Sequence, residues 1–208
     1  MMFNDKKYVE SVWTPDKIAT LENGWEEQKE GWYKLVEPFV PDRSERTLDI
    51  GCGVGMYYDL LQPKTEHYVG MDPTEPMIER ARERRPEGDW RVGSLYQLPF
   101  PNNYFDLTFC WSVLVHLPHE TIERGLNELW RVTDKNLLFN IYMSLDEPSF
   151  SVTGSWGEYL TAMDEMWVMK QIRKMSPRTY KMKPYEPIEK LDGKRFQRYI
   201  YLLRKEVD

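Results

Sequence analysis

Cysteine is scarce in this sequence, with only Cys52 and Cys110 among 208 residues. No Cys-x-x-Cys pair occurs, so neither a disulfide framework nor a cysteine-based zinc site is expected. Isolated cysteines are typical of a chain that works in a reducing compartment. We therefore expect a cytoplasmic protein.

Long apolar runs and histidine clusters are also missing. No stretch of about 18 apolar residues occurs, so no membrane span is expected. Residues 1–7, MMFNDKK, lack the apolar stretch of a signal peptide. Among the three histidines, His116 and His119 lie three positions apart, but no third ligand is near them. We therefore expect no metal site.

An overall excess of basic residues is absent, because the formal net charge is −6. This argues against a protein built around a nucleic-acid backbone. The charge is uneven, however: residues 170–205 hold twelve Lys or Arg against three acids, a net +9, so the rest of the chain carries −15. This basic segment is either a solvated surface or a wall that attracts an acidic substrate.

Strand-like and helix-like patterns alternate through the first 143 residues. The expected strands are residues 46–50, 67–71, 90–92, 104–111 and 136–143, and the expected helices between them are residues 56–61, 75–85 and 119–131. Such alternation predicts an α/β fold, a Rossmann-like three-layer αβα sandwich around a parallel sheet. A chain of this length is expected to form a single domain, residues 1–208.

The flanking regions are predicted to add helices at the start and strands at the end. Region 1–42 is expected to form a helical lid. Thr14 and Pro15 mark the start of a helix, and residues 21–39 are expected to form a second helical segment. Region 144–176 is expected to be a substrate-side insertion or helix, with the helix over residues 158–175.

The last part of the chain holds two further strand-like segments. Residues 180–182 and 196–203 are expected to pair in antiparallel fashion and close the sheet edge. The expected sheet therefore has seven strands, mostly parallel, with an antiparallel C-terminal strand.

A glycine-rich turn follows the first expected strand. Gly51, Gly53 and Gly55 allow a tight turn and a close approach of a ligand, whose anionic group would meet the N-terminus of the next helix. Asp72 ends the next strand, 21 residues after Gly51, where an acid can bind both hydroxyls of a ribose. The alternative is that Asp72 only caps the following helix. Met56 stands where a dinucleotide fingerprint has its last glycine, which disfavours NAD.

These segments resemble a known family in both content and order. Residues 48–55, LDIGCGVG, are similar to motif I of the class I S-adenosylmethionine (SAM)-dependent methyltransferases. Residues 69–73 look like motif II. Residues 93–101, 105–118 and 128–132 resemble segments of the branch that includes the quinone-biosynthesis methyltransferases (methyltransferase domain 11 type). The resemblance covers about residues 46–143. It implies SAM as the cofactor and S-adenosylhomocysteine (SAH) as the product.

The resemblance also implies roles for particular residues around the cofactor. The implied cofactor-binding residues are Asp49, Gly51, Cys52, Gly53, Gly55, Asp72, Pro73, Met77, Ser94, Leu95, Cys110 and Trp111. The three glycines would pack against the methionine part, and Asp49 would lie near its ammonium group. Asp72 would hold the ribose. Pro73 and Met77 would lie beside the adenine, and Ser94 and Leu95 would cover its edge. The carbonyl of Cys110 would face the amino group.

Two positions depart from the family pattern. Ser94 stands where the family usually has Asp, and its hydroxyl would bind the adenine amine more weakly. Residues 133–136, TDKN, replace the usual glycine-containing turn, which should alter a loop and leave cofactor binding largely untouched.

His116 is the candidate catalytic residue. It follows the fourth strand, at the carboxyl end of the sheet where ligands of open α/β folds bind. Its ordinary pKa suits a general base for a hydroxyl acceptor. The alternative is a structural histidine at the start of the next helix. Trp111 and Ser112 either reach the same cleft or pack in the core.

Aromatic and methionine-rich segments allow two interpretations each. The N-terminal aromatic residues could form a lid over the methyl group or pack in the core; they are Trp25, Trp32 and Tyr33. The methionine-rich residues could form an apolar pocket wall or pack in the core; they are Met163, Met166, Trp167 and Met169.

The sequence thus favours a methyltransferase acting on a small-molecule substrate. One alternative is a macromolecular acceptor such as RNA or protein, supported only by the basic segment 170–205. Another is a SAM-binding module without catalysis. No pattern in the sequence indicates an oligomeric state.

Overall fold

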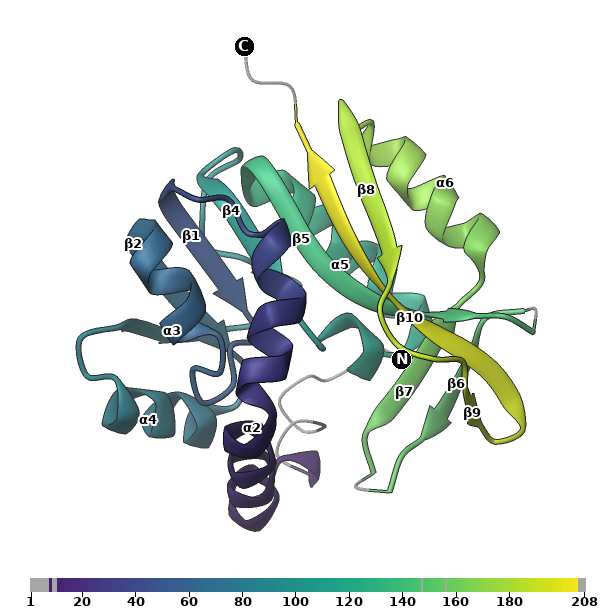
Figure 1. Ribbon diagram of the computed structural model, residues 1–208, viewed down its shortest axis with the longest axis horizontal. Coiled ribbons are helices and arrows are strands. Elements are labelled where there is room, and N and C mark those ends of the chain that lie inside the picture. The colour runs from purple at the N-terminus through teal and green to yellow at the C-terminus, as the bar shows by residue number, and fades with distance from the viewer. Residues whose placement is uncertain (1–7, 9–10, 147, 156, 206–208) are drawn as a thin grey trace.

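The protein is built around one mixed β-sheet, seen in a computed structural model that describes residues 8, 11–146, 148–155 and 157–205. The main path of the sheet has the order β3-β2-β1-β4-β5-β10-β8. These strands are β1 Ser44–Ile50, β2 Thr65–Asp72, β3 Asp89–Val92, β4 Phe105–Cys110, β5 Thr133–Ser144, β8 Thr179–Pro184 and β10 Lys194–Arg204. The first five are parallel, and β10 runs antiparallel to both β5 and β8. The predicted Rossmann-like fold is therefore confirmed (Figure 1).

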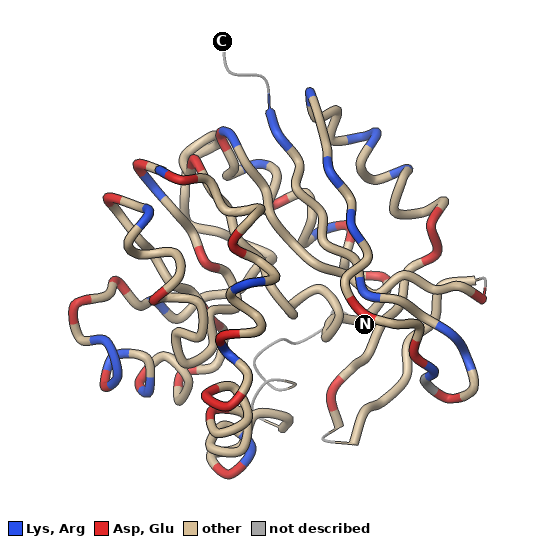
Figure 2. Tube along the Cα trace, viewed as in Figure 1, with Lys and Arg blue, Asp and Glu red and all other residues tan. Residues whose placement is uncertain are grey.

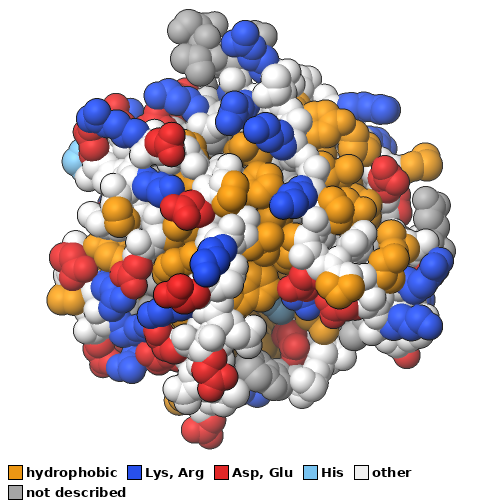
Figure 3. All heavy atoms as spheres, in the orientation of Figure 1, with side chains coloured by type: hydrophobic (Ala, Val, Ile, Leu, Met, Phe, Trp, Pro, Cys, Tyr) orange, Lys and Arg blue, Asp and Glu red, His pale blue; other side chains and the backbone are white. Residues whose placement is uncertain are grey.

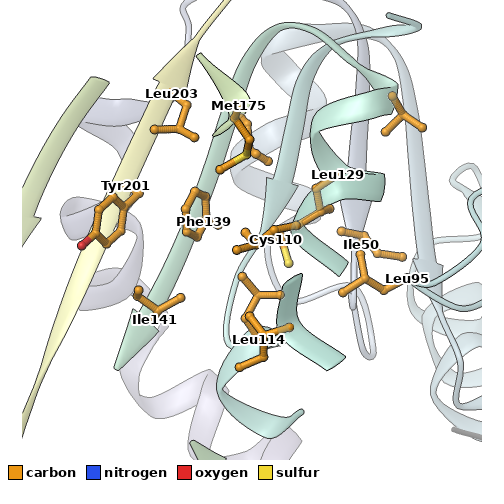
Figure 4. Packing of buried hydrophobic residues seen from close by; sticks show 14 of the residues in the cluster. Ile50, Leu95, Cys110, Leu114, Leu129, Phe139, Ile141, Met175, Tyr201 and Leu203 are labelled. Carbon is orange, nitrogen blue, oxygen red and sulfur yellow. The ribbon is translucent and has the colours of Figure 1, made fainter. Parts of the chain in front are cut away.

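Helices cover both faces of this sheet. They are α2 Pro15–Val36, α3 Tyr58–Leu61, α4 Glu75–Arg84, α5 His119–Val132 and α6 Glu165–Met175. Alternate residues of each strand point to opposite faces. Leu138 and Ile200 pack on the face of α2, α3 and α4, and Phe139 and Tyr201 pack on the face of α5 and α6. Figure 4 shows the latter layer, where the rings of Phe139 and Tyr201 stack at 5.2 Å.

The apolar composition of the central strands agrees with their position between two layers of helices. Every residue of β4, FDLTFC, is buried, as expected for a parallel strand covered by helices on both faces. In α5, Ile122, Leu126 and Leu129 recur at helical spacing and are buried against the sheet. α5 ends at Val132 and β5 begins at Thr133, so the helix is followed directly by the strand. Residues 133–136, which were predicted to form an altered loop, therefore belong to β5.

The N-terminal region differs from its prediction. A single helix, α2, runs from Pro15 to Val36, and the 3₁₀ turn Glu37–Phe39 follows it. The predicted separate segment 21–39 is therefore wrong. Two glycines inside the helix, Gly24 and Gly31, cost about 1 kcal/mol each in propensity. Burial of residues such as Trp25 against the domain offsets this cost.

The largest error in the predicted elements lies in region 144–176. The helix predicted to begin at residue 158 does not begin there. Its first residues instead form β7 Tyr159–Met163, which makes a hairpin with β6 Phe150–Thr153. β7 pairs with the carboxyl end of β5 through Tyr142 and Met143. The helix begins only after Asp164, whose side chain accepts a hydrogen bond from the Trp167 N–H at 2.8 Å.

The C-terminal strands agree with the prediction and add one element. β8 and β10 form the expected antiparallel pair, and a short unpredicted strand, β9 Glu189–Leu191, pairs with the start of β10. Across the described residues, no helix has the length and apolar character needed to span a bilayer.

Candidate functional site

One cavity of about 170 Å³ lies where β1, β2 and β4 end. The glycine turn, the end of β2 and the segment after β4 all line it. N-terminal residues Tyr8, Trp13 and Leu21 complete its wall. The position is the one where open parallel sheets bind their ligands.

The glycine turn follows β1 with backbone conformations that favour glycine. Gly51, Gly53 and Gly55 have φ angles of 73°, 55° and 80°. A Cβ on Gly51 would lie 2.1 Å from a methyl group of Val113, so this position has no room for a side chain. A Cβ on Gly53 would point toward Met77 and Met56, which line the cavity, so glycine keeps this space open.

Asp72 ties the glycine turn to the end of β2. Its carboxylate accepts hydrogen bonds from the Gly53 N–H at 3.0 Å and from the Thr74 N–H at 2.8 Å. Thr74, not Asp72, is the N-cap residue of α4. Burial raises the pKa of Asp72, and these two backbone donors oppose that rise. Each oxygen of a carboxylate can accept more than one hydrogen bond, so Asp72 can also accept from ligand hydroxyls.

A second buried carboxylate, Asp49, lies behind the glycine turn. The Tyr68 hydroxyl donates a hydrogen bond to its carboxylate at 2.8 Å. Burial raises the pKa of Asp49 to about 7, with a further contribution from the charge of Asp72. Asp49 is thus a buried acid that titrates near neutral pH.

The structure separates the predicted cofactor residues into two groups. Those that line the cavity are Gly51, Gly53, Asp72, Pro73, Met77, Leu95 and Trp111. The described residues that were predicted but lie outside its lining are Asp49, Cys52, Gly55, Ser94 and Cys110. Gly55 faces the ring of Trp90, and the Ser94 hydroxyl accepts from the Tyr96 N–H at 3.3 Å.

His116 lines the same cavity, from the 3₁₀ turn Leu114–His116 after β4. Its ring Nδ1 is 3.0 Å from the carbonyl oxygen of Tyr159. A carbonyl oxygen can only accept, so Nδ1 carries the proton and Nε2 keeps its lone pair. Burial lowers the pKa of His116 below its usual 6.5, against smaller opposing effects of Tyr159 and Glu158, and Arg198 lowers it slightly further. The imidazole is therefore neutral at neutral pH.

The position of His116 depends on residues that sequence analysis missed. The Tyr8 hydroxyl donates to the His116 carbonyl at 3.2 Å and accepts from the Tyr159 N–H at 2.8 Å. The ring of Trp13 meets the imidazole edge-on, with centroids 6.0 Å apart. No local pattern marks Tyr8 or Tyr159. Trp13 stands directly before the predicted helix start, and a large aromatic residue at that place could have indicated a contact with the site.

A polar chain centred on the buried Asn140 supports the turn after β4. Ser112 has a left-handed φ of 54°, a conformation that costs a side-chain-bearing residue about 1 kcal/mol or more. Its N–H donates to Asn140 Oδ1 at 2.6 Å, and Asn140 Nδ2 donates to the Tyr185 hydroxyl at 2.9 Å. The Tyr185 ring packs on Trp111 at 5.6 Å. The segment after β8 therefore helps to hold Trp111 and Ser112, which both line the cavity.

Of the two interpretations of the N-terminal aromatic residues, lid or core, the structure supports the core. The ring of Trp25 packs against Tyr57 at 4.8 Å, and the Tyr33 hydroxyl donates to the Met56 carbonyl at 2.8 Å. Trp32 packs against the same core cluster. None of these three lines the cavity. They support the glycine turn from behind, and the core interpretation holds for them.

The methionine-rich segment is not a cavity wall either. Met163, Trp167 and Met169 pack in or against the core, while Met166 is 74% exposed. The pocket-wall interpretation is therefore wrong for this cavity.

The basic segment 170–205 lies along β8, α6 and the edge of the sheet (Figure 2). None of its described residues lines the cavity. Part of its charge is already paired, as in Arg198–Glu186 at 2.7 Å and Arg195–Asp146 at 2.8 Å. Figure 3 shows Lys and Arg side chains at the upper edge of this face and hydrophobic side chains toward its centre. Within the described chain, no three His, Cys, Asp or Glu gather as a metal site.

Comparison with known proteins identifies the central segment. Residues 47–136 match the model of a methyltransferase domain family. An uncharacterized methyltransferase of Schizosaccharomyces pombe is 35% identical over 105 residues, covering 44% of this chain and 37% of that protein. A malonyl-[acyl-carrier protein] O-methyltransferase of Erwinia pyrifoliae is 32% identical over 106 residues, covering 51% of this chain and 40% of that protein. The chain thus spans less than half the length of these curated relatives.

Solved structures share the fold at low sequence identity. Phosphoethanolamine N-methyltransferase 2 of Haemonchus contortus, in complex with SAM, superposes with a TM-score of 0.75 at 13% identity. The match covers 98% of this chain and 60% of that one. Together with the family model, this confirms the resemblance predicted from the sequence.

Proposed function

We propose that this chain, whose residues 47–136 form a methyltransferase domain, transfers a methyl group from SAM to the hydroxyl of a small molecule. One observation carries the proposal. The glycine turn and Asp72, here called the cofactor end, line the same cavity as His116, whose Nε2 is unprotonated and which belongs with its neighbours to the acceptor end. A cofactor held by the glycine turn and Asp72 would therefore share one cavity with a base.

The residues at the cofactor end suit SAM. The absence of a side chain at Gly53 leaves space that a Cβ would enter. Asp72 can accept from ribose hydroxyls while it holds the turn, and Pro73, Met77 and Leu95 offer apolar contacts to the adenine. Two buried carboxylates, Asp49 and Asp72, suit a cofactor that carries positive charge. When bound, the cofactor supplies a methyl group on a cationic sulfur.

The chain's own residues then orient the acceptor and exclude water. Ile50, Trp111, Val113 and Leu117 give the cavity an apolar wall. Correct orientation can lower the barrier by roughly 7–11 kcal/mol. Bound SAM would supply the methyl group to the acceptor oxygen and leave as SAH, and Nε2 of His116 would take the proton of the acceptor hydroxyl. A base in this role contributes about 10²–10⁴-fold to the rate.

The Nδ1 hydrogen bond of His116 favours an enzyme over a non-catalytic SAM-binding module. That bond to Tyr159 fixes the tautomer that can accept a proton inside the cavity. A macromolecular acceptor is less supported, because the described part of the basic segment 170–205 contributes nothing to the cavity lining.

The substitution His116→Asn tests the proposal. Asparagine can still donate to the Tyr159 carbonyl, but it cannot take the acceptor's proton. We expect unchanged SAH affinity by calorimetry and a loss of turnover of about 10²–10⁴-fold, followed as SAH formation. His119→Asn is the matched control, because His119 is exposed and lies outside the cavity lining, and it should retain activity. Full turnover in His116→Asn would remove the histidine from the proposed mechanism.

A further inference from the structure

We infer that the methyl acceptor is an uncharged, largely apolar molecule, and that the cavity discriminates against carboxylate- and phosphate-bearing compounds. This inference rests on the proposed function and adds the chemical class of its substrate.

The acceptor end of the cavity is aromatic and aliphatic. Tyr8, Trp13 and Trp111 supply rings, and Val113 and Leu117 supply aliphatic side chains. Cavities of this composition bind ligands through apolar contact, and a few polar groups set the orientation. The polar side-chain groups here are the His116 imidazole, the hydroxyls of Ser112 and Tyr8 and the indole N–H groups of the two tryptophans. The Tyr8 hydroxyl already bridges the His116 carbonyl and the Tyr159 N–H, so the acceptor needs one hydroxyl and little other polarity.

A cation that would pair with an anionic acceptor is missing from the described lining. Neither Lys nor Arg occurs among those lining residues, and the ionisable acid that does occur there is Asp72. Among the described lining residues, an anion entering this cavity would find no cationic partner. Burying a charge without an opposite charge is unfavourable.

Arg198, a cation that lowers the pKa of His116, is already paired with other residues. The Arg198 guanidinium pairs with Glu186 at 2.7 Å and with Glu189 at 3.2 Å, and it also lies over the ring of Tyr142 at 5.0 Å. Two carboxylates balance its single charge. Arg198 therefore does not offer an anionic acceptor a free partner.

A matched pair of phenols tests the inference. With SAH at saturation, calorimetry would compare 4-hydroxyacetophenone with 4-hydroxybenzoate, which have nearly the same shape and differ in charge. We expect the neutral phenol to bind at least tenfold more tightly. Equal or tighter binding of the benzoate would overturn the inference, and so would a lack of binding of the neutral phenol at millimolar concentration.

A charge substitution tests the electrostatic reason. Trp13→Lys places a cation in the cavity wall, so the tenfold preference should fall to threefold or less. Met166→Lys is the control, because Met166 is 74% exposed and lies outside the cavity lining. If Trp13→Lys is unfolded, Leu21→Lys at the same wall replaces it. An unchanged preference in a folded, SAH-binding variant would contradict the electrostatic reason.

The two proposals fail in different ways. If SAH itself does not bind, the proposed function fails at the cofactor end. If SAH binds normally but the phenols show no preference for the neutral form, only the acceptor class is wrong.

Discussion

The two ends of the cavity are assembled in different ways. The cofactor end comes from the glycine turn and the end of β2, which Asp72 joins through the Gly53 N–H across 19 positions of sequence. The acceptor end needs Tyr8 to reach the backbone of Tyr159, 151 positions away. The difference teaches that one end is a local motif on a common fold, whereas the other is made by long-range packing. Substrate choice can therefore vary while cofactor binding stays constant.

The largest expected effect is a loss of cofactor affinity when Asp72, at the cofactor end, is replaced. Asp72→Ala removes the carboxylate that holds Gly53 and Thr74 and that would accept from the ribose. Hydrogen bonds to a charged group contribute about 1.5–3 kcal/mol each, so we expect SAH affinity to fall at least 100-fold by calorimetry. The control is Asp106→Ala, because Asp106 is also buried but binds Lys135 and the backbone of Arg46. Asp106→Ala should lower stability and leave SAH affinity unchanged; a similar loss in both variants would count against the site.

The next effect is a pH dependence confined to the cofactor end. Burial raises the pKa of Asp49 to about 7, so the unliganded chain holds this proton below neutrality. The ionised form favours a cationic cofactor, so SAM affinity should rise by up to about tenfold per pH unit as pH increases toward 7, with proton release on binding. Calorimetry in two buffers of different ionisation enthalpy measures the released proton.

The substitution Asp49→Asn should remove this pH dependence. The raised pKa of Asp49 also makes the stability of the folded chain depend on pH. Because the folded-state pKa of Asp49 is raised, its contribution to stability is lost as pH rises from about 4 to about 7 in the unliganded chain. Affinity that does not change with pH below 7 in the wild-type chain would show that Asp49 does not sense the cofactor.

A smaller effect is expected from the polar chain behind the acceptor end. Asn140→Leu leaves the Ser112 N–H and the Tyr185 hydroxyl without their buried partner. We expect the free energy of unfolding to fall by about 1–3 kcal/mol in denaturant titrations, with phenol binding weakened and SAH binding retained. Asn136→Leu, on the same strand, loses only a 3.4 Å contact to the Asp106 carbonyl and should cost less. The reverse order would contradict the supporting role of Asn140.

The smallest effect concerns Tyr8. Tyr8→Phe removes one hydroxyl that bridges the His116 carbonyl and the Tyr159 N–H. The expected loss is about 0.5–1.5 kcal/mol in the free energy of unfolding, because backbone groups on both sides lose one partner. Tyr180→Phe is the control, since Tyr180 is 46% exposed on β8 and should have no measurable effect. Equal melting temperatures for the two variants would show that the bridge contributes nothing.

The same contrast explains which features sequence analysis predicted. The parallel strands are short apolar runs, and the glycine turn and Asp72 follow strand ends at the spacing of a known motif, so each is visible within about 25 residues. The β6–β7 hairpin was missed because residues 158–163 carry no clear helical or strand period, and Asp164 was not recognised as the helix start. The contacts of His116 were missed because Tyr8 and Tyr159 meet only after the sheet has formed.

The most direct test of the account is a calorimetric titration of the purified chain with SAM and with SAH. The account predicts one site per chain with a dissociation constant in the micromolar range, lost in Asp72→Ala and retained in His116→Asn. Absence of binding by the wild-type chain, or binding that survives Asp72→Ala unchanged, would contradict the claim that this cavity is a cofactor site.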